Sequence, residues 1–128
     1  MISLTIGQPD FPTPDHIKKA GMNAIHENFT VYTHNAGYLP LRQAISHYVH
    51  KKYDLTYSPE SEIIVTIGAS EAIDVALRTV LCTGDEVILP GPVYPGYEPI
   101  IRMCQGVPVF ADTRDNQFKL TKDVLEKY

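Results

Sequence analysis

The chain has 128 residues, of which 44% are hydrophobic, which is enough for one folded domain and argues against disorder. Its formal net charge of −4 argues against nucleic acid or an anionic membrane as its main partner. No apolar run approaches the roughly 20 residues of a membrane span, and no signal peptide is visible. We therefore expect a cytoplasmic domain in which Cys82 and Cys104 are free thiols.

The first forty residues predict two loops separated by a helix. Three prolines between Pro9 and Pro14 exclude a helix or an inner strand there, after a short extended segment over Ser3–Ile6. Thr13 and Pro14 suit the N-cap and first residue of a helix that ends near Asn28. A polar and aromatic loop follows over residues 29–39.

The rest of the chain alternates between strand and helix patterns. Three apolar runs predict strands: Ile63–Ile67, Val87–Leu89 and Val107–Ala111. Helical spacing or capping predicts helices in four places: from about Pro40, from Ser70 to about Leu81, over Pro99–Gln105, and from Lys122 after Thr121. Strands separated by helices are typical of an α/β domain with a mainly parallel sheet.

The turn after the first predicted strand is the most informative local feature. Gly68, Ala69 and Ser70 are small residues at the start of a helix, and we expect Ser70 at the N-cap. The unpaired N–H groups and positive dipole end of a helix N-terminus suit a phosphate. The turn matches neither the P-loop nor the dinucleotide-binding glycine pattern. An ordinary helix cap that binds nothing is the alternative.

Four motifs in order give the chain a family resemblance. They are Gly7-Gln8-Pro9-Asp10-Phe11-Pro12-Thr13-Pro14, Tyr32 with Asn35-Ala36-Gly37-Tyr38-Leu39-Pro40-Leu41-Arg42, Gly68-Ala69-Ser70-Glu71-Ala72, and Gly84-Asp85-Glu86-Val87 with Pro92-Val93-Tyr94. Together they resemble the N-terminal part of the class I and II aminotransferases, which are pyridoxal-phosphate enzymes of fold type I. Residues 90–99 look most like the bacterial branch with aromatic and N-acetyl-diaminopimelate aminotransferases.

The resemblance covers essentially all 128 residues and implies a fold. Residues 1–128 would be an N-terminal fragment of one aminotransferase domain, with a helical arm and loop over about 1–40. Residues from about 41 to 128 would be the first part of the three-layer α/β/α large domain. Because Tyr128 ends inside a helical pattern, we expect a piece of a larger chain. The parent would be a homodimer that transfers an amino group from an L-amino acid to a 2-oxo acid.

The resemblance also implies roles for single residues. The Gly68–Ser70 turn would hold the phosphate of pyridoxal 5'-phosphate (PLP), and Tyr94 would stack on its pyridine ring. Tyr32 would donate its hydroxyl to the phosphate in the partner subunit. Gly7 would let the backbone lie close to the substrate carboxylate, although an ordinary turn glycine explains it equally well. Gly37 is expected to be structural, at a turn position with positive φ.

Other parts of the family's active site have no counterpart in these residues. The Schiff-base lysine with its Ser-x-Ser-Lys context, the Asn-Pro-x-Asn-Pro-x-Gly loop, the aspartate for the pyridine nitrogen and the carboxylate-binding arginine are all absent. We therefore expect no catalytic residue in this chain and no turnover by the chain alone. His47 and His50 lie three apart on a helix but lack a third ligand, so no metal site is expected.

Three other functions fit the same motifs. The parent could be a PLP-dependent carbon–sulfur lyase, which would release pyruvate and ammonia without an oxo-acid acceptor. It could be a transcription regulator with an aminotransferase-like sensor domain, which predicts a DNA-binding domain before Met1. It could also be an α/β interaction module with a decayed site.

Overall fold

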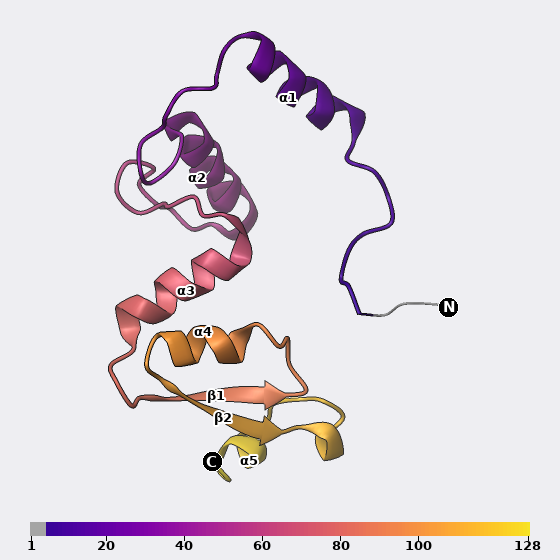
Figure 1. Cartoon of the computed structure of the whole chain (residues 1–128), viewed down its shortest axis with the longest axis vertical. Coiled ribbons are helices and arrows are strands. Elements are labelled where there is room, and N and C mark those ends of the chain that lie inside the picture. The colour runs from indigo at the N-terminus through magenta and orange to yellow at the C-terminus, as the bar shows by residue number, and fades with distance from the viewer. Residues whose placement is uncertain (1–4) are drawn as a thin grey trace.

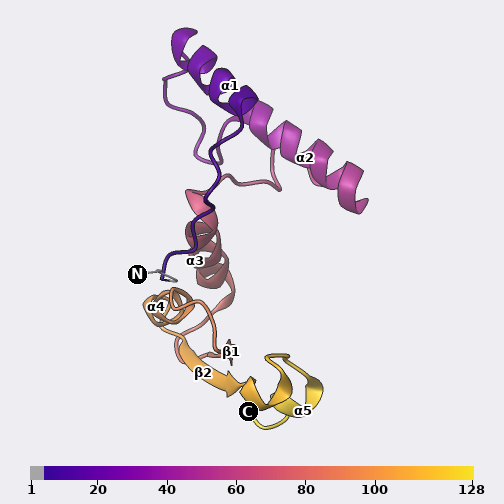
Figure 2. The same ribbon diagram turned by 90° about the vertical axis from the view of Figure 1, so that its right-hand side faces the viewer.

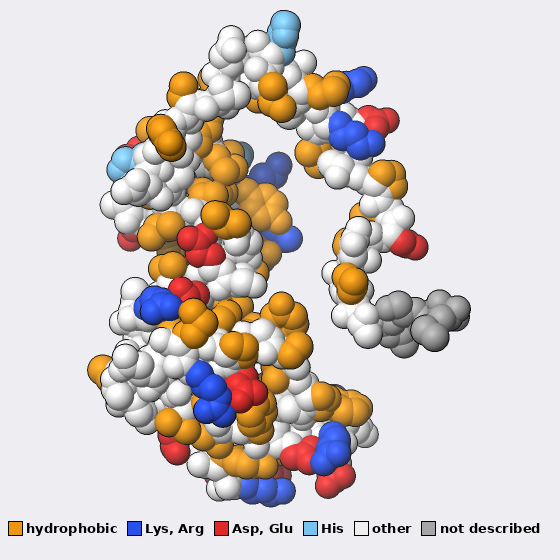
Figure 3. Space-filling model, viewed as in Figure 1, with side chains coloured by type: hydrophobic (Ala, Val, Ile, Leu, Met, Phe, Trp, Pro, Cys, Tyr) orange, Lys and Arg blue, Asp and Glu red, His pale blue; other side chains and the backbone are white. Residues whose placement is uncertain are grey.

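The computed structural model describes residues 5–128, so the extended segment expected over Ser3–Ile6 lies partly outside the described residues. The described part contains five α-helices, one 3-10 helix and two strands, in the order α1, α2, α3, β1, α4, β2, η1, α5 (Figure 1). The ribbon is C-shaped, and α1 forms an arm that is separated from the lower elements by an open gap (Figures 1 and 3).

The N-terminal helices begin close to their predicted starts. α1 spans Asp15–His26 and has Pro14 at its N-cap, so the prediction that Thr13 caps this helix was wrong by one residue. Proline suits this place because a helix start does not need its missing N–H group. α2 spans Leu39–Tyr53, with Pro40 in its first turn. α3 spans Gly68–Val80.

The C-terminal half is a small parallel α/β unit. β1 (Glu86–Gly91) pairs in parallel with β2 (Val107–Asp112) from Glu86↔Val107 to Gly91↔Asp112. α4 (Tyr97–Met103) connects the two strands and lies on the side of the sheet toward α3, whereas α5 (Lys122–Leu125) lies on the other side (Figures 1 and 2). The 3-10 helix η1 (Arg114–Asn116) follows β2. The parallel α/β arrangement predicted from the sequence is confirmed.

The core is small and lies around this sheet. Four hydrophobic side chains are buried among residues 5–128, one each from β1, α4, β2 and α5: Leu89, Ile101, Ala111 and Val124. The chain exposes 10788 Å², whereas a compact protein of its mass exposes about 6,800 Å². Much apolar surface is therefore uncovered, and Figure 3 shows hydrophobic side chains along the rim of the gap.

The predicted strand Ile63–Ile67 is not a strand in the structure, so this prediction was wrong. The segment has no regular secondary structure, and within the described residues the sheet contains only β1 and β2. The N–H of Val65 donates instead to the carbonyl of Ala36, at 2.9 Å. A β-strand requires a ladder of such bonds to a neighbouring strand, and a single bond to a turn does not provide one.

Candidate functional site

The small-residue turn forms the first turn of α3. Ile67 occupies the N-cap and no side chain caps the helix, so the prediction that Ser70 is the N-cap was wrong. Ser70 is instead the third helical residue. Gly68 has φ +76°, a backbone region that side chains with a Cβ rarely adopt. A Cβ added at Gly68 would meet nothing within 4 Å, so the helix begins in open space.

Polar contacts around this turn leave part of the helix N-terminus open. The Glu71 carboxylate accepts a hydrogen bond from the N–H of Ile67, and the N–H of Gly68 donates to the carbonyl of Thr66 at 2.9 Å. The N–H groups of Ala69 and Ser70 come next. They lie in the first turn of the helix, where backbone N–H groups have no acceptor within the helix. They are on exposed residues at the positive end of a 13-residue helix. This end of α3 can therefore accept an anionic oxygen.

Tyr94 lies in the loop that leads from β1 to α4. Its side chain is 59% exposed, and its ring lies edge-on to that of Tyr97, with centroids 5.4 Å apart. A Cβ added at Gly96 would overlap the Tyr94 ring, so glycine makes room for this ring position. The Tyr94 ring therefore packs edge-on against Tyr97 and is still more than half exposed, so a flat aromatic ligand can reach it.

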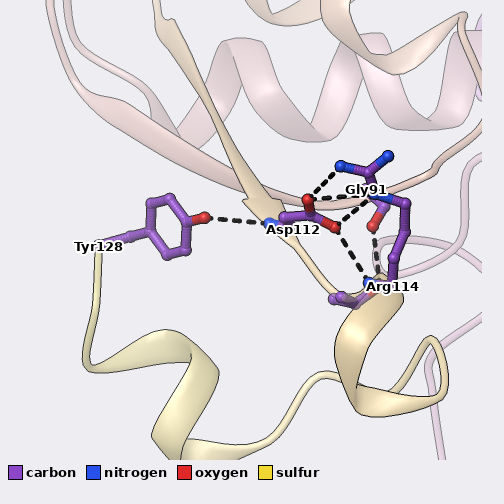
Figure 4. Close-up of polar contacts among 5 residues, drawn as sticks. Gly91, Asp112, Arg114 and Tyr128 are labelled. Carbon is purple, nitrogen blue, oxygen red and sulfur yellow. Dashed lines mark hydrogen bonds and ion pairs between the residues drawn. The ribbon is translucent and has the colours of Figure 1, made fainter.

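The ends of β1 and β2 are tied together beside this loop (Figure 4). The carbonyl of Gly91 accepts the backbone N–H of Thr113 at 3.0 Å and the Thr113 hydroxyl at 2.8 Å. Arg114 Nε lies 3.0 and 3.1 Å from the two carboxylate oxygens of Asp112, and Nη2 lies 2.6 Å from one of them. The Asp112 N–H donates to the Tyr128 hydroxyl at 3.1 Å. Carboxyl ends of parallel strands are a common place for ligand sites in α/β folds.

The ion pair at this strand end has an electrostatic consequence. Hydrogen bonds from the Arg114 side chain, and then from its backbone N–H, lower the pKa of Asp112 from 3.8 to about 2. The same pair raises the pKa of the Arg114 guanidinium. Asp112 therefore remains a carboxylate throughout the physiological pH range.

Tyr32 and Gly7 lie on the arm side of the molecule. Tyr32 is fully exposed in the loop between α1 and α2. Gly7 lies in the segment before α1, and a Cβ added there would meet nothing within 4 Å. In Figure 1 this segment lies on the opposite side of the open gap from α3 and α4. Among the described residues, the structure therefore does not bring Gly7 into contact with α3 or α4.

A buried arginine ties the loop that carries Tyr32 to the segment before Gly68. Arg42 is only 4% exposed, and its guanidinium donates to the carbonyls of Gly37 at 3.1 Å, Pro59 at 2.6 Å and Glu60 at 3.2 Å. Gly37 has φ +98°, as expected, and a Cβ there would lie 2.6 Å from the Cβ of Val65. Sequence reasoning missed this role of Arg42, because two of its partners lie 17 and 18 residues away.

Residues 5–128 contain neither a group of three or more His, Cys, Asp or Glu side chains that could hold a metal ion nor a helix long and apolar enough to cross a membrane. Cys82 and Cys104 are both free thiols.

An apolar hollow of about 490 Å³ lies beside α1 and contains none of the predicted site residues. Its lining is Ala24, Phe29, Val31, Thr33 and Tyr38.

Comparisons with known proteins agree with the motifs. The sequence profile described as "Aminotransferase class I and II" matches residues 1–128. The chain is 62% identical over 126 residues to the probable N-acetyl-LL-diaminopimelate aminotransferase of Bacillus subtilis, covering 98% of this chain and 32% of that protein. It is 38% identical over 129 residues to aromatic-amino-acid aminotransferase 2 of Thermococcus litoralis, covering 100% of this chain and 33% of the relative.

The solved structures identify the fold. An aromatic aminotransferase from Pyrococcus horikoshii superposes with a TM-score of 0.92 at 38% identity, covering 99% of this chain and 34% of that chain. An aspartate aminotransferase from Rhizobium meliloti gives a TM-score of 0.86 at 38% identity, over 97% of this chain and 31% of that chain. The chain thus spans about a third of the length of its relatives and has the fold of that part of a fold type I enzyme. It belongs to the class I and II aminotransferase family.

Proposed function

We propose that the protein to which this chain belongs is a PLP-dependent aminotransferase, or transaminase. It would transfer an amino group from an L-amino acid to a 2-oxo acid. The observation that carries the proposal is the N-terminus of α3, which begins at a positive-φ glycine and exposes N–H groups in open space. Membership of the aminotransferase family supports the same conclusion.

The residues present fit the two ends of the proposed cofactor. The N–H groups of Ala69 and Ser70, with the Ser70 hydroxyl, would hold the phosphate, and Gly68 would keep the approach open. The exposed ring of Tyr94 would lie against the pyridine ring, fix its plane and exclude water from that face. When bound, PLP supplies an electron sink for the substrate carbon that loses its proton.

Further parts of the proposal concern the arm and a second subunit. Tyr32 would bind the phosphate in the partner subunit of a homodimer, which its full exposure permits. Gly7 would lie close to the substrate carboxylate, where a Cβ would intrude. We propose that residues to about 40 form this arm and that the large-domain part starts at about residue 41.

We also propose that the 128 residues alone do not transaminate. A lysine that reacts with a carbonyl needs a lowered pKa and a neutral amine. Lys52 instead has surroundings that favour its charged form. Its ammonium lies 5.3 and 5.2 Å from the ring centroids of Tyr48 and Tyr53. Its hydrogen bond to the Tyr48 hydroxyl, at 2.8 Å, raises the Lys52 pKa. Lys18 and Lys122 are held in exposed ion pairs with acids one helical turn away.

We propose the amino donor from the Bacillus subtilis relative. That relative is named as a probable N-acetyl-LL-diaminopimelate aminotransferase and is 62% identical over this chain. We propose an N-acylated diamino-dicarboxylate of this type as the amino substrate, a 2-oxo acid as the acceptor, and the cytoplasm as the place of reaction. Aromatic amino acids are the alternative donors, because relatives of that specificity are also similar.

A product assay tests this function. The complete product of the gene, loaded with PLP, is supplied with N-acetyl-LL-diaminopimelate or an aromatic amino acid, with and without 2-oxoglutarate. We expect a new amino acid to form only when donor and acceptor are both present. With a thioether amino acid such as cystathionine as the sole substrate, ammonia and pyruvate without an acceptor would show a carbon–sulfur lyase, and no product under any condition would refute the enzymatic proposal. The isolated 128-residue chain is the matched sample in which no turnover is expected.

A further inference from the structure

The Gly91 carbonyl is the last backbone group that ties β1 to its neighbour. In a parallel ladder, the carbonyl of one strand accepts the N–H of the next residue on the other strand. The Thr113 N–H makes this bond at 3.0 Å, one residue after the Gly91↔Asp112 pair. The next residue, Pro92, has no N–H. The position of Gly91 therefore sets the direction in which the loop leaves the sheet toward Tyr94.

The Thr113 side chain adds a second bond to the same carbonyl. Its hydroxyl donates to the Gly91 oxygen at 2.8 Å, and Thr113 is only 2% exposed. A buried hydroxyl is costly without an acceptor, so this contact is held firmly. The preceding residue is fixed independently, because Asp112 is bound by the Arg114 guanidinium and donates its N–H to Tyr128 (Figure 4). The Thr113 carbonyl also accepts the N–H groups of Asn116 and Phe118, at 3.0 and 2.9 Å, so the donor side is held by its own segment and the loop side is what the contact restrains.

We propose that Thr113 is a positioning residue that fixes the loop over residues 92–96, and through it the ring of Tyr94. Its hydroxyl and N–H together hold the Gly91 carbonyl, three residues before Tyr94. The far end of the loop is held by α4, through the bond from the Tyr97 N–H to the Tyr94 carbonyl at 3.3 Å and through the ring contact. The part of this inference that concerns cofactor affinity rests on the proposed function of Tyr94.

The test uses three variants of the complete gene product. Thr113→Val keeps the shape of the side chain and removes the hydroxyl, and Thr113→Ser restores the hydroxyl. Thr79→Val is the matched control, because the Thr79 hydroxyl also donates to a backbone carbonyl, that of Ala76 at 2.7 Å, but within α3. If Thr113→Val fails to fold, Thr113→Ala replaces it. The readouts are backbone hydrogen exchange over residues 93–97 without cofactor and the dissociation constant for PLP.

The expected results separate the positioning role from the proposed function. Thr113→Val should speed exchange over residues 93–97 by about tenfold, in line with the loss of one buried hydrogen bond. It should raise the PLP dissociation constant by a similar factor. Thr113→Ser should return both values to within about threefold of wild type, and Thr79→Val should change neither.

Other results would overturn the inference. Unchanged exchange over residues 93–97 in Thr113→Val would show that the hydroxyl does not restrain the loop. Faster exchange with unchanged PLP affinity would show that the restraint does not position Tyr94 for the cofactor. Failure of the wild-type protein to bind PLP would refute the proposed function instead, and hydrogen exchange without cofactor would still decide whether Thr113 fixes the loop.

Discussion

Gly37 shows how one residue brings two distant segments together. Its positive φ turns the chain after the loop that carries Tyr32, and its missing side chain lets Val65 approach. Val65 lies three residues before Gly68, and its N–H donates a hydrogen bond to the carbonyl of Ala36. The positive φ was predictable from the sequence, because glycine between Ala36 and Tyr38 is typical of a turn. The contact with Val65 was not, because nothing local links residues so far apart in the chain.

An alanine at position 37 tests this close approach. Gly37→Ala should destabilise the complete gene product by about 2 kcal/mol, through overpacking against Val65 and a disfavoured φ. Gly21→Ala is the control: Gly21 lies inside α1, and a Cβ there meets nothing within 4 Å. Gly21→Ala should stabilise the protein by roughly 0.5–1 kcal/mol, because alanine has the higher helix propensity. Denaturant unfolding measures both changes, and equal effects at the two sites would contradict the assigned role of Gly37.

Most elements were predictable from local patterns. The helices α2, α3 and α4 and the strands β1 and β2 all lie within a few residues of their predicted ranges, because apolar spacing and turn residues act locally. Residues 63–67 have the composition of a strand, but strand formation depends on a neighbouring strand, which local composition does not supply. The bond from Thr113 to Gly91 spans 22 residues, so no local signal indicated it.

The end of β2 also predicts a pH dependence. Because the pKa of Asp112 is about 2 in the folded chain and ordinarily 3.8, its pairing with Arg114 stabilises the fold above pH 4. This contribution is lost as the pH falls from about 4 toward 2. Asp112→Asn should therefore lower the thermal midpoint of the complete gene product near neutral pH, with the difference from wild type shrinking below about pH 4. A difference that stays constant down to pH 2 would contradict this assignment.

At the scale of the whole molecule, the exposed apolar surface predicts association. The chain is open, its core is confined to the sheet unit, and its surface exceeds that of a compact protein by more than half. Helix α1 has no buried residue, and Ile64 and Ile67 are 64% and 90% exposed. Large uncovered apolar faces favour contacts with other chains.

The isolated 128-residue chain should therefore self-associate in solution and bind a hydrophobic dye. The complete gene product is the control, and it should bind much less dye per mole. Size-exclusion chromatography with light scattering measures the association. A monomer with a radius of gyration near the roughly 14 Å of a compact domain of this length would contradict the prediction.

The most direct test of the phosphate site compares two ligands that differ only in the phosphate. Dissociation constants for PLP and for pyridoxal are measured with the wild-type complete gene product, Ser70→Ala and the control Thr79→Val. If α3 holds the phosphate, Ser70→Ala should weaken PLP binding by about fivefold to tenfold and leave pyridoxal binding unchanged. Thr79→Val should change neither. Equal effects of Ser70→Ala on the two ligands, or wild-type affinity for PLP in Ser70→Ala, would contradict a phosphate site that uses Ser70.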